Sequence, residues 1–341
     1  MRYYVQFTAG TGGLVRDALA ARLDRLRVEY ADDSAMILDS VTGPAGVAAI
    51  PFLKNAFLLI AVTERRDLAK SVRRVSQSLR REQFRSVPGS PDRFRLMAHL
   101  DGGLVPIEPR ARGALEHAVA RHTGARLEPR GMGQEYWIIG RQGLPELLFG
   151  ARLPKPPRTP TAKGALAYEL AAMLVAASKP TPEDRFLDPF GGSGALVAAR
   201  AELPARSLGY SDLDLDRHRR ALTAQLPRRA QVGLLAEDAL TLPSVPDDTI
   251  DVIVTDPPWG EHEELDRPFG EFAQAIGESF ARTLHPDRGR YVLLINRRNA
   301  DTMAEALTAA ALSPTARHDI LVNGHPATVL IGAQGTSTAR R

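Results

Sequence analysis

Acidic residues follow short apolar runs at four places in the second half of the sequence. These residues are Asp188, Asp212, Asp238 and Asp256. A carboxylate only accepts hydrogen bonds, so it suits a ligand rich in hydroxyl and amine donors. Open α/β sheets bind nucleotides at the carboxyl ends of their strands, and each of the four residues is predicted to stand at such an end. These strand ends are therefore the places where a ligand site is expected.

The first of these places is the segment Asp188-Pro-Phe-Gly-Gly-Ser-Gly194, where a strand runs into a glycine-rich turn and then a helix that is predicted to begin near Ser193. Glycines let the backbone approach a ligand closely. The turn lacks the G-x-G-x-x-G spacing of dinucleotide sites and the Gly-Lys-Ser/Thr ending of phosphate loops. Nicotinamide cofactors and ATP are therefore disfavoured.

The fourth place is an apolar strand that runs directly into Asp256-Pro257-Pro258-Trp259. Because proline cannot donate to a sheet ladder, the strand must stop at Asp256. Its carboxylate and the carbonyl groups of the two prolines offer acceptors to the N–H groups of an exocyclic amine. Trp259 offers a flat surface for an extruded base, which is worth about 1–3 kcal/mol per stacked base. The alternative is a strand that ends in a proline turn with a buried tryptophan.

The first motif resembles that of class I S-adenosylmethionine (SAM) methyltransferases, in the form found in enzymes that act on amino groups. The Asp256 segment resembles the N/D-P-P-Y/F/W motif of methyltransferases acting on adenine, cytosine, guanine or glutamine, with Trp259 where Tyr or Phe is more usual. The resemblance implies that Asp212 accepts hydrogen bonds from the ribose and that Asp238 meets the adenine amino group. A helix cap or a solvated loop remains the alternative for any single aspartate.

The resemblance implies SAM as the cofactor and assigns two sets of residues. The predicted catalytic residues are Asp256, Pro257, Pro258 and Trp259. The predicted cofactor-binding residues are Asp188, Phe190, Gly191, Gly192, Ser193, Gly194, Asp212, Leu213, Asp238, Ala239 and Asp256.

Strands alternate with helical patterns behind these motifs, after an expected helix over Ala165–Ser178. This alternation predicts βαβ units and a mainly parallel, Rossmann-like sheet. The seven expected strands are Arg185–Asp188, Leu208–Ser211, Val232–Leu235, Ile250–Thr255, Tyr291–Asn296, His318–Val322 and Ala327–Ile331.

The first half of the chain has the pattern of an α+β domain. The expected helices are Gly13–Leu26 and Pro109–His122, and the expected strands are Tyr3–Thr8, Ser34–Leu38, Phe94–His99 and Glu135–Ile139. Four prolines between Leu153 and Thr161 favour an extended connector at this point, because they exclude a helix or a central strand.

The net charge also differs between the two sides of this proline-rich connector. Residues 1–160 hold 25 Lys and Arg against 16 Asp and Glu, a net charge of +9, whereas the rest of the chain carries −5. A basic half favours a polyanionic partner. Spacings of three and four in the densest stretch suggest one stripe of a helix, for which a solvated face is an equal alternative. The stretch consists of Arg65, Arg66, Lys70, Arg73, Arg74, Arg80, Arg81 and Arg85.

The segment from Arg158 to Ala171 resembles the one that precedes the SAM motif in THUMP-domain RNA methyltransferases, which make N2-methylguanosine in tRNA, with a branch that acts on rRNA. Phe94–Leu96, Glu135–Ile139 and Gly150–Leu153 resemble parts of a THUMP domain. The resemblance implies tRNA as the partner, contacted by the basic half, including Arg66, Lys70, Arg73, Arg74 and Arg81. The implied domains are a ferredoxin-like region (1–65), a THUMP-like domain (66–153), a linker (154–164), the methyltransferase domain (165–335) and a tail (336–341).

Several other classes are disfavoured. The chain has no cysteine, which excludes disulfides, thiolate zinc sites and cysteine nucleophiles. The segment Glu261-His262-Glu263-Glu264 lacks the H-E-x-x-H spacing, so we expect no metal site. The N-terminal residues do not read as a secretion signal, and the apolar stretch Ala45–Val62 is interrupted by Pro51 and Lys54. We expect a soluble, cytoplasmic protein with no membrane contact.

Four other functions share part of this pattern. A DNA adenine or cytosine amino methyltransferase has the same catalytic motif, and an rRNA guanine-N2 methyltransferase has the same chemistry. A protein glutamine methyltransferase would be expected to carry Asn at position 256. A non-catalytic RNA-binding relict would not need the four aspartates.

Overall fold

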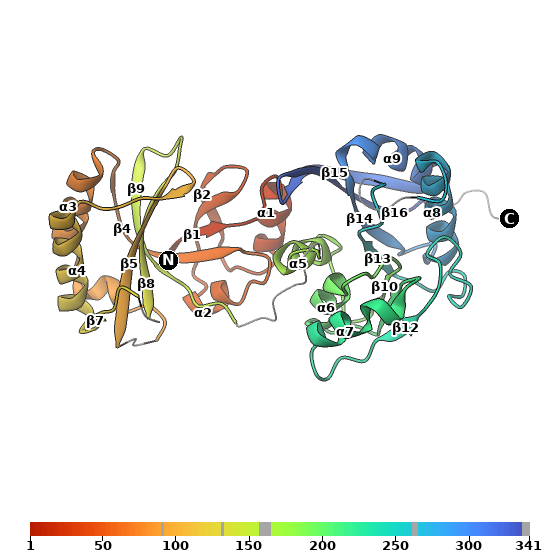
Figure 1. Ribbon diagram of the computed structural model, residues 1–341, viewed down its shortest axis with the longest axis horizontal. Helices are drawn as coiled ribbons and strands as arrows, with labels where there is room; N and C mark the ends of the chain where they lie inside the picture. The colour runs from red at the N-terminus through yellow and green to blue at the C-terminus, as the bar shows by residue number, and fades with distance from the viewer. Residues whose placement is uncertain (90–91, 131–132, 157–164, 261–264, 336–341) are drawn as a thin grey trace. The chain divides into compact units, whose positions relative to one another are not determined.

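The computed structural model describes residues 1–89, 92–130, 133–156, 165–260 and 265–335 (Figure 1). Two compact units divide the chain. The first comprises Met1–Phe7 and Leu19–Pro156, and the second comprises Thr8–Ala18 together with the described residues after Pro156. The 336–341 tail and most of the predicted 154–164 linker lie outside the described residues, so their bounds stay predictions.

Nine strands of the first unit form one sheet among the described residues, in the order β2-β3-β1-β4-β9-β8-β5-β6, with β7 paired to β5. The strands are β1 (Arg2–Gln6), β2 (Arg27–Ala31), β3 (Ala35–Asp39), β4 (Asn55–Glu64), β5 (Arg93–Leu100), β6 (Gly103–Leu104), β7 (Arg126–Leu127), β8 (Gln134–Gly140) and β9 (Glu146–Arg152). The helices of this unit are α2 (Pro44–Ala48), α3 (Leu68–Ser78) and α4 (Pro109–Thr123), whereas most of α1 (Gly12–Ala20) belongs to the second unit. The sheet thus joins strands from both regions that the sequence divides at residue 65.

Local signals explain where these helices begin and end. Glu108 caps α4, since its carboxylate accepts hydrogen bonds from the N–H groups of Arg110 (3.0 Å) and Ala111 (2.9 Å). Gly124 ends the helix with a φ of 76°, a left-handed conformation that favours glycine. α1 ends at Ala20, six residues before the expected end, and the chain then turns through Arg25 at a φ of 51°.

The expectation of one basic helical stripe was wrong. Of the eight residues, only Lys70, Arg73 and Arg74 lie within α3. Asp67 caps this helix by accepting a hydrogen bond from the Lys70 N–H at 3.0 Å, so Arg65 and Arg66 precede it. The others follow the helix, which ends at Ser78, and Arg81 lies in a short 3-10 turn (Arg81–Phe84). The prediction failed because the three- and four-residue spacing of basic residues extends beyond both ends of the helix.

The second unit contains a seven-stranded sheet in the order β12-β11-β10-β13-β14-β16-β15. Its strands are β10 (Arg185–Asp188), β11 (Ser207–Ser211), β12 (Gly233–Leu235), β13 (Val252–Thr255), β14 (Arg290–Asn296), β15 (Leu312–Val322) and β16 (His325–Gln334). β10 to β14 run parallel, and β16 runs antiparallel to both β14 and β15. The strand order reverses between β10 and β13, which is where open α/β sheets bind ligands.

Helices complete this unit: α5 (Tyr168–Ala177), α6 (Ala195–Ala201), α7 (Leu215–Gln225), α8 (Phe269–Thr283) and α9 (Ala300–Ala309). α6 begins just after the expected Ser193, because Gly194 precedes it in a left-handed conformation (φ 82°). β15 begins at Leu312, six residues before the expected start. Its pairing with β16 has a bulge between Pro314 and Ala316, and an edge strand tolerates that proline.

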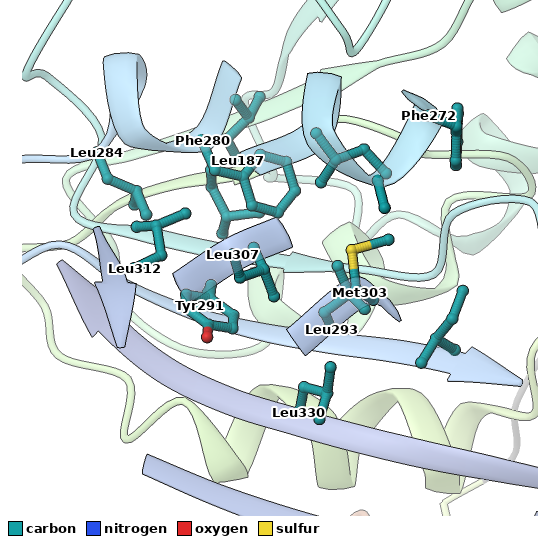
Figure 2. Close-up of a cluster of buried hydrophobic side chains, with 14 of the residues drawn as sticks. Leu187, Phe272, Phe280, Leu284, Tyr291, Leu293, Met303, Leu307, Leu312 and Leu330 are labelled. Atoms are coloured by element: carbon teal, nitrogen blue, oxygen red, sulfur yellow. The ribbon is translucent and has the colours of Figure 1, made fainter. Parts of the chain in front are cut away.

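One face of this sheet packs against α8 and α9 (Figure 2). Leu187 and Leu293 from the sheet lie in a common core with Phe280 of α8 and Met303 of α9, and all four are at most 1% exposed. Burying a side chain of this size stabilises a fold by about 1.5–3 kcal/mol. This core holds β10 through Leu187 and β13 through Ile253, the strands that end at Asp188 and just before Asp256. No helix in the described ranges is long and apolar enough to span a membrane.

Candidate functional site

Asp188 stands at the carboxyl end of β10 and is almost completely buried, at 1% exposure. Its Oδ1 accepts a hydrogen bond from the Thr255 hydroxyl, at 2.8 Å, at the end of the neighbouring strand β13. Its Oδ2 is buried and has no hydrogen-bond partner among the described residues. An unpaired buried carboxylate oxygen is costly, so this atom marks a place where a ligand donor would be stabilising.

The surroundings of Asp188 disfavour its charged form. Burial raises the pKa of the Asp188 carboxyl to about 8, and the nearby charges of Asp256 and Asp212 add to the increase in pKa. The hydrogen bond from the Thr255 hydroxyl and the nearby Phe190 N–H, which itself donates to Thr255 at 3.3 Å, lower the pKa. A cationic donor next to Oδ2 would reverse this balance and favour the carboxylate.

The glycine-rich turn after Asp188 is held closely by its neighbours. The Gly191 N–H donates to the Ser211 carbonyl at 2.8 Å, and a Cβ at Gly191 would lie 2.1 Å from the Tyr210 ring. The Tyr210 hydroxyl in turn donates to the Gly192 carbonyl at 2.7 Å. Gly192 has a φ of 48°, and no atom lies closer than 4.0 Å to the position of a Cβ there. The turn is therefore packed against the protein at Gly191 and open at Gly192.

Asp212 lies directly after β11 and links two of the predicted segments. Its Oδ2 accepts from the Gly192 N–H and its Oδ1 from the Asp214 N–H, both at 2.8 Å. Each carboxylate oxygen has room for a second donor, so these bonds leave capacity for ligand hydroxyl groups. Leu213 beside it is 74% exposed, which is unusual for leucine and places an apolar side chain at the same strand end.

Asp238 occupies a turn after β12. Its Oδ1 accepts from the Leu240 N–H at 2.9 Å, which is the loop-stabilising role considered for a single aspartate. Ala239 is buried, and its carbonyl accepts from the Ser279 hydroxyl of α8 at 2.7 Å. The Ser211 hydroxyl donates to the Glu237 carbonyl at 3.0 Å, so this turn is tied to the end of β11.

Asp256 lies at the carboxyl end of β13, half-buried, with Pro257 buried behind it. Its Oδ1 accepts from the Trp259 indole Nε1 at 2.9 Å. The Trp259 carbonyl accepts from two side-chain amides, Asn296 Nδ2 at 3.3 Å and Asn299 Nδ2 at 3.1 Å. The Trp259 side chain is partly buried and packs against the core shown in Figure 2. Both ends of this motif are thus held in place by hydrogen bonds.

A cavity of about 320 Å³ adjoins the motif. Trp259 and Phe269 provide aromatic lining, and Asn299 and Arg298 provide polar lining. This volume lies at the lower end of the range of roughly 300–1,000 Å³ that small-molecule pockets occupy. No group of three or more metal-ligating side chains is present in the part of the chain that the structure describes. The segment 261–264 lies outside that part.

The chain's similarity to known proteins agrees with this geometry. Residues 156–212 and 216–325 match the family described as RMKL-like, methyltransferase domain (UPF0020). The chain thus contains an RMKL-like methyltransferase domain within residues 156–325. S-adenosyl-L-methionine is accordingly the cofactor of this domain, as the sequence predicts. Among curated proteins, no sequence matches this chain significantly.

Solved structures share the fold over nearly the whole chain. TrmN from Thermus thermophilus is 20% identical and superposes with a TM-score of 0.75, covering 98% of this chain and 99% of TrmN. SMU.472, solved in complex with SAH, is 12% identical with a TM-score of 0.70, covering 99% and 98% of the two chains. A protein from Listeria monocytogenes str. 4b F2365, described as a predicted N6-adenine-specific DNA methylase, is 12% identical with a TM-score of 0.67, covering 98% and 96%. At these identities the likeness shows the fold alone.

The described residues of the methyltransferase domain fit the cofactor. The buried Asp188 Oδ2 lacks a donor, which the α-ammonium group of SAM has, and Gly192 leaves open space beside it. Asp212 keeps acceptor capacity for ribose hydroxyls, with the exposed Leu213 beside it. The assignment of each residue to the cofactor stays a prediction from the sequence.

Sequence reasoning missed three side chains that organise this site. Thr255 binds Asp188, and Asn296 and Asn299 hold the Trp259 carbonyl. One signal was available for Asn296, which is a polar residue at the end of the buried strand β14 and is only 2% exposed. The rule that identified the aspartates, a polar side chain at the carboxyl end of an apolar strand, would have found it.

Proposed function

We propose that the protein transfers a methyl group from SAM to the exocyclic 2-amino group of a guanosine in tRNA. The observation that carries this proposal is the Asp256–Trp259 motif, hydrogen-bonded at both ends and bordered by a cavity, beside the glycine-rich turn after β10. The charge of +9 on residues 1–160 and the resemblance to THUMP-domain RNA methyltransferases support tRNA as the substrate.

When bound, SAM supplies an electrophilic methyl group on a sulfonium centre. The chain's own contribution is alignment and electrostatics. Asp256 and the Pro257 carbonyl are acceptors for the amine N–H groups, and such hydrogen bonds would localise the nitrogen lone pair that the ring otherwise delocalises. Trp259 is held at its indole N–H and at its carbonyl, so its ring forms a fixed wall for a target base. Asp188 and Asp212 would hold the cofactor through its ammonium group and its ribose hydroxyls.

The test is incubation of the purified protein with labelled SAM and unmodified tRNA, in parallel with duplex DNA and rRNA, followed by nucleoside analysis. We expect label in N2-methylguanosine from tRNA. Asp256→Ala should reduce turnover at least about 100-fold, as loss of one preorganised electrostatic group does, while SAM still binds. Asp256→Asn is the matched variant, because its amide oxygen still accepts from the Trp259 indole and its activity should fall less.

Other outcomes assign other functions. Label in DNA adenine or cytosine would retain the chemistry and refute the tRNA substrate. One solved relative is described as a predicted N6-adenine-specific DNA methylase, which makes DNA the second candidate. Label in rRNA alone would indicate an rRNA methyltransferase. Label in a glutamine side chain would indicate a protein methyltransferase. Full turnover by Asp256→Ala would refute the mechanism, and a wild-type protein that binds no SAM would support the relict.

A further inference from the structure

The turn after β14 carries four consecutive polar residues, Asn296 to Asn299, and their side chains have different roles. Asn296 and Asn299 donate to the Trp259 carbonyl, and the Asn296 Oδ1 accepts from the Asn299 N–H at 2.9 Å. Arg297 faces the β15 strand, where it donates to the Ile320 carbonyl at 3.3 Å and pairs with Asp319 at 3.5 Å. These three side chains are therefore occupied with structural contacts.

Arg298 differs from its neighbours. It is exposed, it lines the cavity beside Trp259, and no described residue forms a hydrogen bond or ion pair with it. The other arginine of this cavity, Arg267, is bound by both oxygens of Asp266, at 2.9 and 3.0 Å. Glu271 and Asp238 lie near enough to raise the pKa of Arg267 further. Among the described residues that line the cavity, Arg298 is thus the positively charged side chain that has no acidic partner.

We propose that Arg298 binds a backbone phosphate of the substrate nucleic acid, adjacent to the nucleotide whose base enters the cavity beside Trp259. The inference rests on the proposed function and names a substrate contact for the same site. A base presented to a methyltransferase leaves its stack, and its flanking phosphates then lie at the mouth of the pocket. A guanidinium matches a phosphate with two parallel N–H donors, and the lining provides aromatic faces in Trp259 and Phe269.

Asn296 and Asn299 connect this contact to the catalytic motif. They hold the Trp259 carbonyl from the same turn that carries Arg298, so the backbone at Arg298 is tied to the motif by two hydrogen bonds. The turn therefore sets the position of the nucleotide backbone against the acceptor groups of Asp256 and Pro257.

The first test compares Arg298→Ala with Arg297→Ala, which removes the same charge from the neighbouring position. Turnover of tRNA is measured between 50 and 200 mM salt, and SAM binding is measured by calorimetry. Arg298→Ala should lower kcat/KM about tenfold or more, and the slope of log affinity against log salt should decrease by about 0.7–0.9, as for one lost phosphate contact. Arg298→Lys should recover part of the loss, and Arg297→Ala should stay within about threefold of wild type.

Each outcome decides the question. Equal effects of Arg298→Ala and Arg297→Ala overturn the inference. Weaker SAM binding by Arg298→Ala would assign the arginine to the cofactor carboxylate instead, which also overturns it. A wild-type protein without activity on tRNA refutes the proposed function alone if DNA or rRNA accepts the label, because Arg298 is then tested on that substrate. Activity on no nucleic acid refutes both.

A second measurement does not need turnover. The chain has two tryptophans, so in a Trp137→Phe background the fluorescence comes from Trp259 alone. Guanosine 3′,5′-bisphosphate should bind about tenfold or more tightly than guanosine, and this ratio should approach one in the Arg298→Ala variant. An unchanged ratio, or no quenching by either ligand, would overturn the assignment of the cavity.

Discussion

The raised pKa of Asp188 predicts how SAM affinity depends on pH. The ligand-free carboxyl has a pKa of about 8 because it is buried beside Asp256 and Asp212. The ammonium group of SAM requires the charged carboxylate, so binding must release the proton that Asp188 holds at lower pH. Affinity should therefore increase as the pH rises toward 8 and should fall as the pH is lowered.

The magnitude follows from the size of the shift. With a pKa of about 8, roughly one tenth of the ligand-free protein carries a charged Asp188 at pH 7. Ionising the rest costs about 1.4 kcal/mol at pH 7 and about 2.7 kcal/mol at pH 6. The dissociation constant for SAM should thus increase about tenfold for each pH unit below 7.5. An α-amino group titrates near 7.7–8.0, so the measurements belong below this range.

Isothermal titration calorimetry between pH 5.5 and 7.5 would measure both quantities. Repeating the titration at pH 6.5 in two buffers with different ionisation enthalpies should show about one proton released per SAM bound. Asp188→Asn keeps an acceptor for the Thr255 hydroxyl and cannot ionise, so its affinity should not depend on pH in this range. A flat profile for the wild type, or no proton release, would refute the reasoning.

The same shift affects the stability of the ligand-free protein. The folded carboxyl binds its proton more tightly than the unfolded one, whose pKa is near 3.8. Its stabilising contribution is present below this value and is lost as the pH rises through about 8, by about 1.4 kcal/mol per pH unit. The free energy of unfolding, measured in urea, should decrease more steeply with rising pH for the wild type than for Asp188→Asn across this window.

Three further results are expected. Gly191→Ala should destabilise the protein by about 1–3 kcal/mol and weaken SAM binding, because its Cβ would lie 2.1 Å from the Tyr210 ring. The control is Gly270→Ala, where no atom lies within 4 Å of the Cβ position, and its stability in thermal unfolding should stay within about 1 kcal/mol of wild type. Asp184→Ala should cost about 3–5 kcal/mol in urea unfolding, since it leaves the fully buried Arg200 without its carboxylate. Asn299→Ala should lower kcat while SAM affinity stays unchanged, and equal loss of both would indicate general unfolding of the site.

Much of the methyltransferase domain could be predicted from local pattern. Apolar runs that end in Asp188 and in Asp256-Pro-Pro are strands whatever surrounds them, because proline cannot continue a ladder. Other elements carried weaker signals. The strand Glu146–Arg152 is absent from the predicted strands, and only Gly150–Leu153 at its end resembles part of a THUMP domain. The helix that starts at Gly12 ends at Ala20, and the apolar periodicity that continues to Leu26 does not predict the turn through Arg25.

The sequence by itself determined which groups could do the chemistry and at which strand ends they stand. Only the tertiary structure decided which of them meet. Asp188 and Thr255 lie 67 residues apart and share a hydrogen bond because β10 and β13 are neighbours in the sheet. Asn299 reaches the Trp259 carbonyl across 40 residues, and the same turn places Arg298 in the lining of the cavity. Periodicity and proline act within a few residues, whereas strand order and side-chain partners depend on how the whole sheet packs.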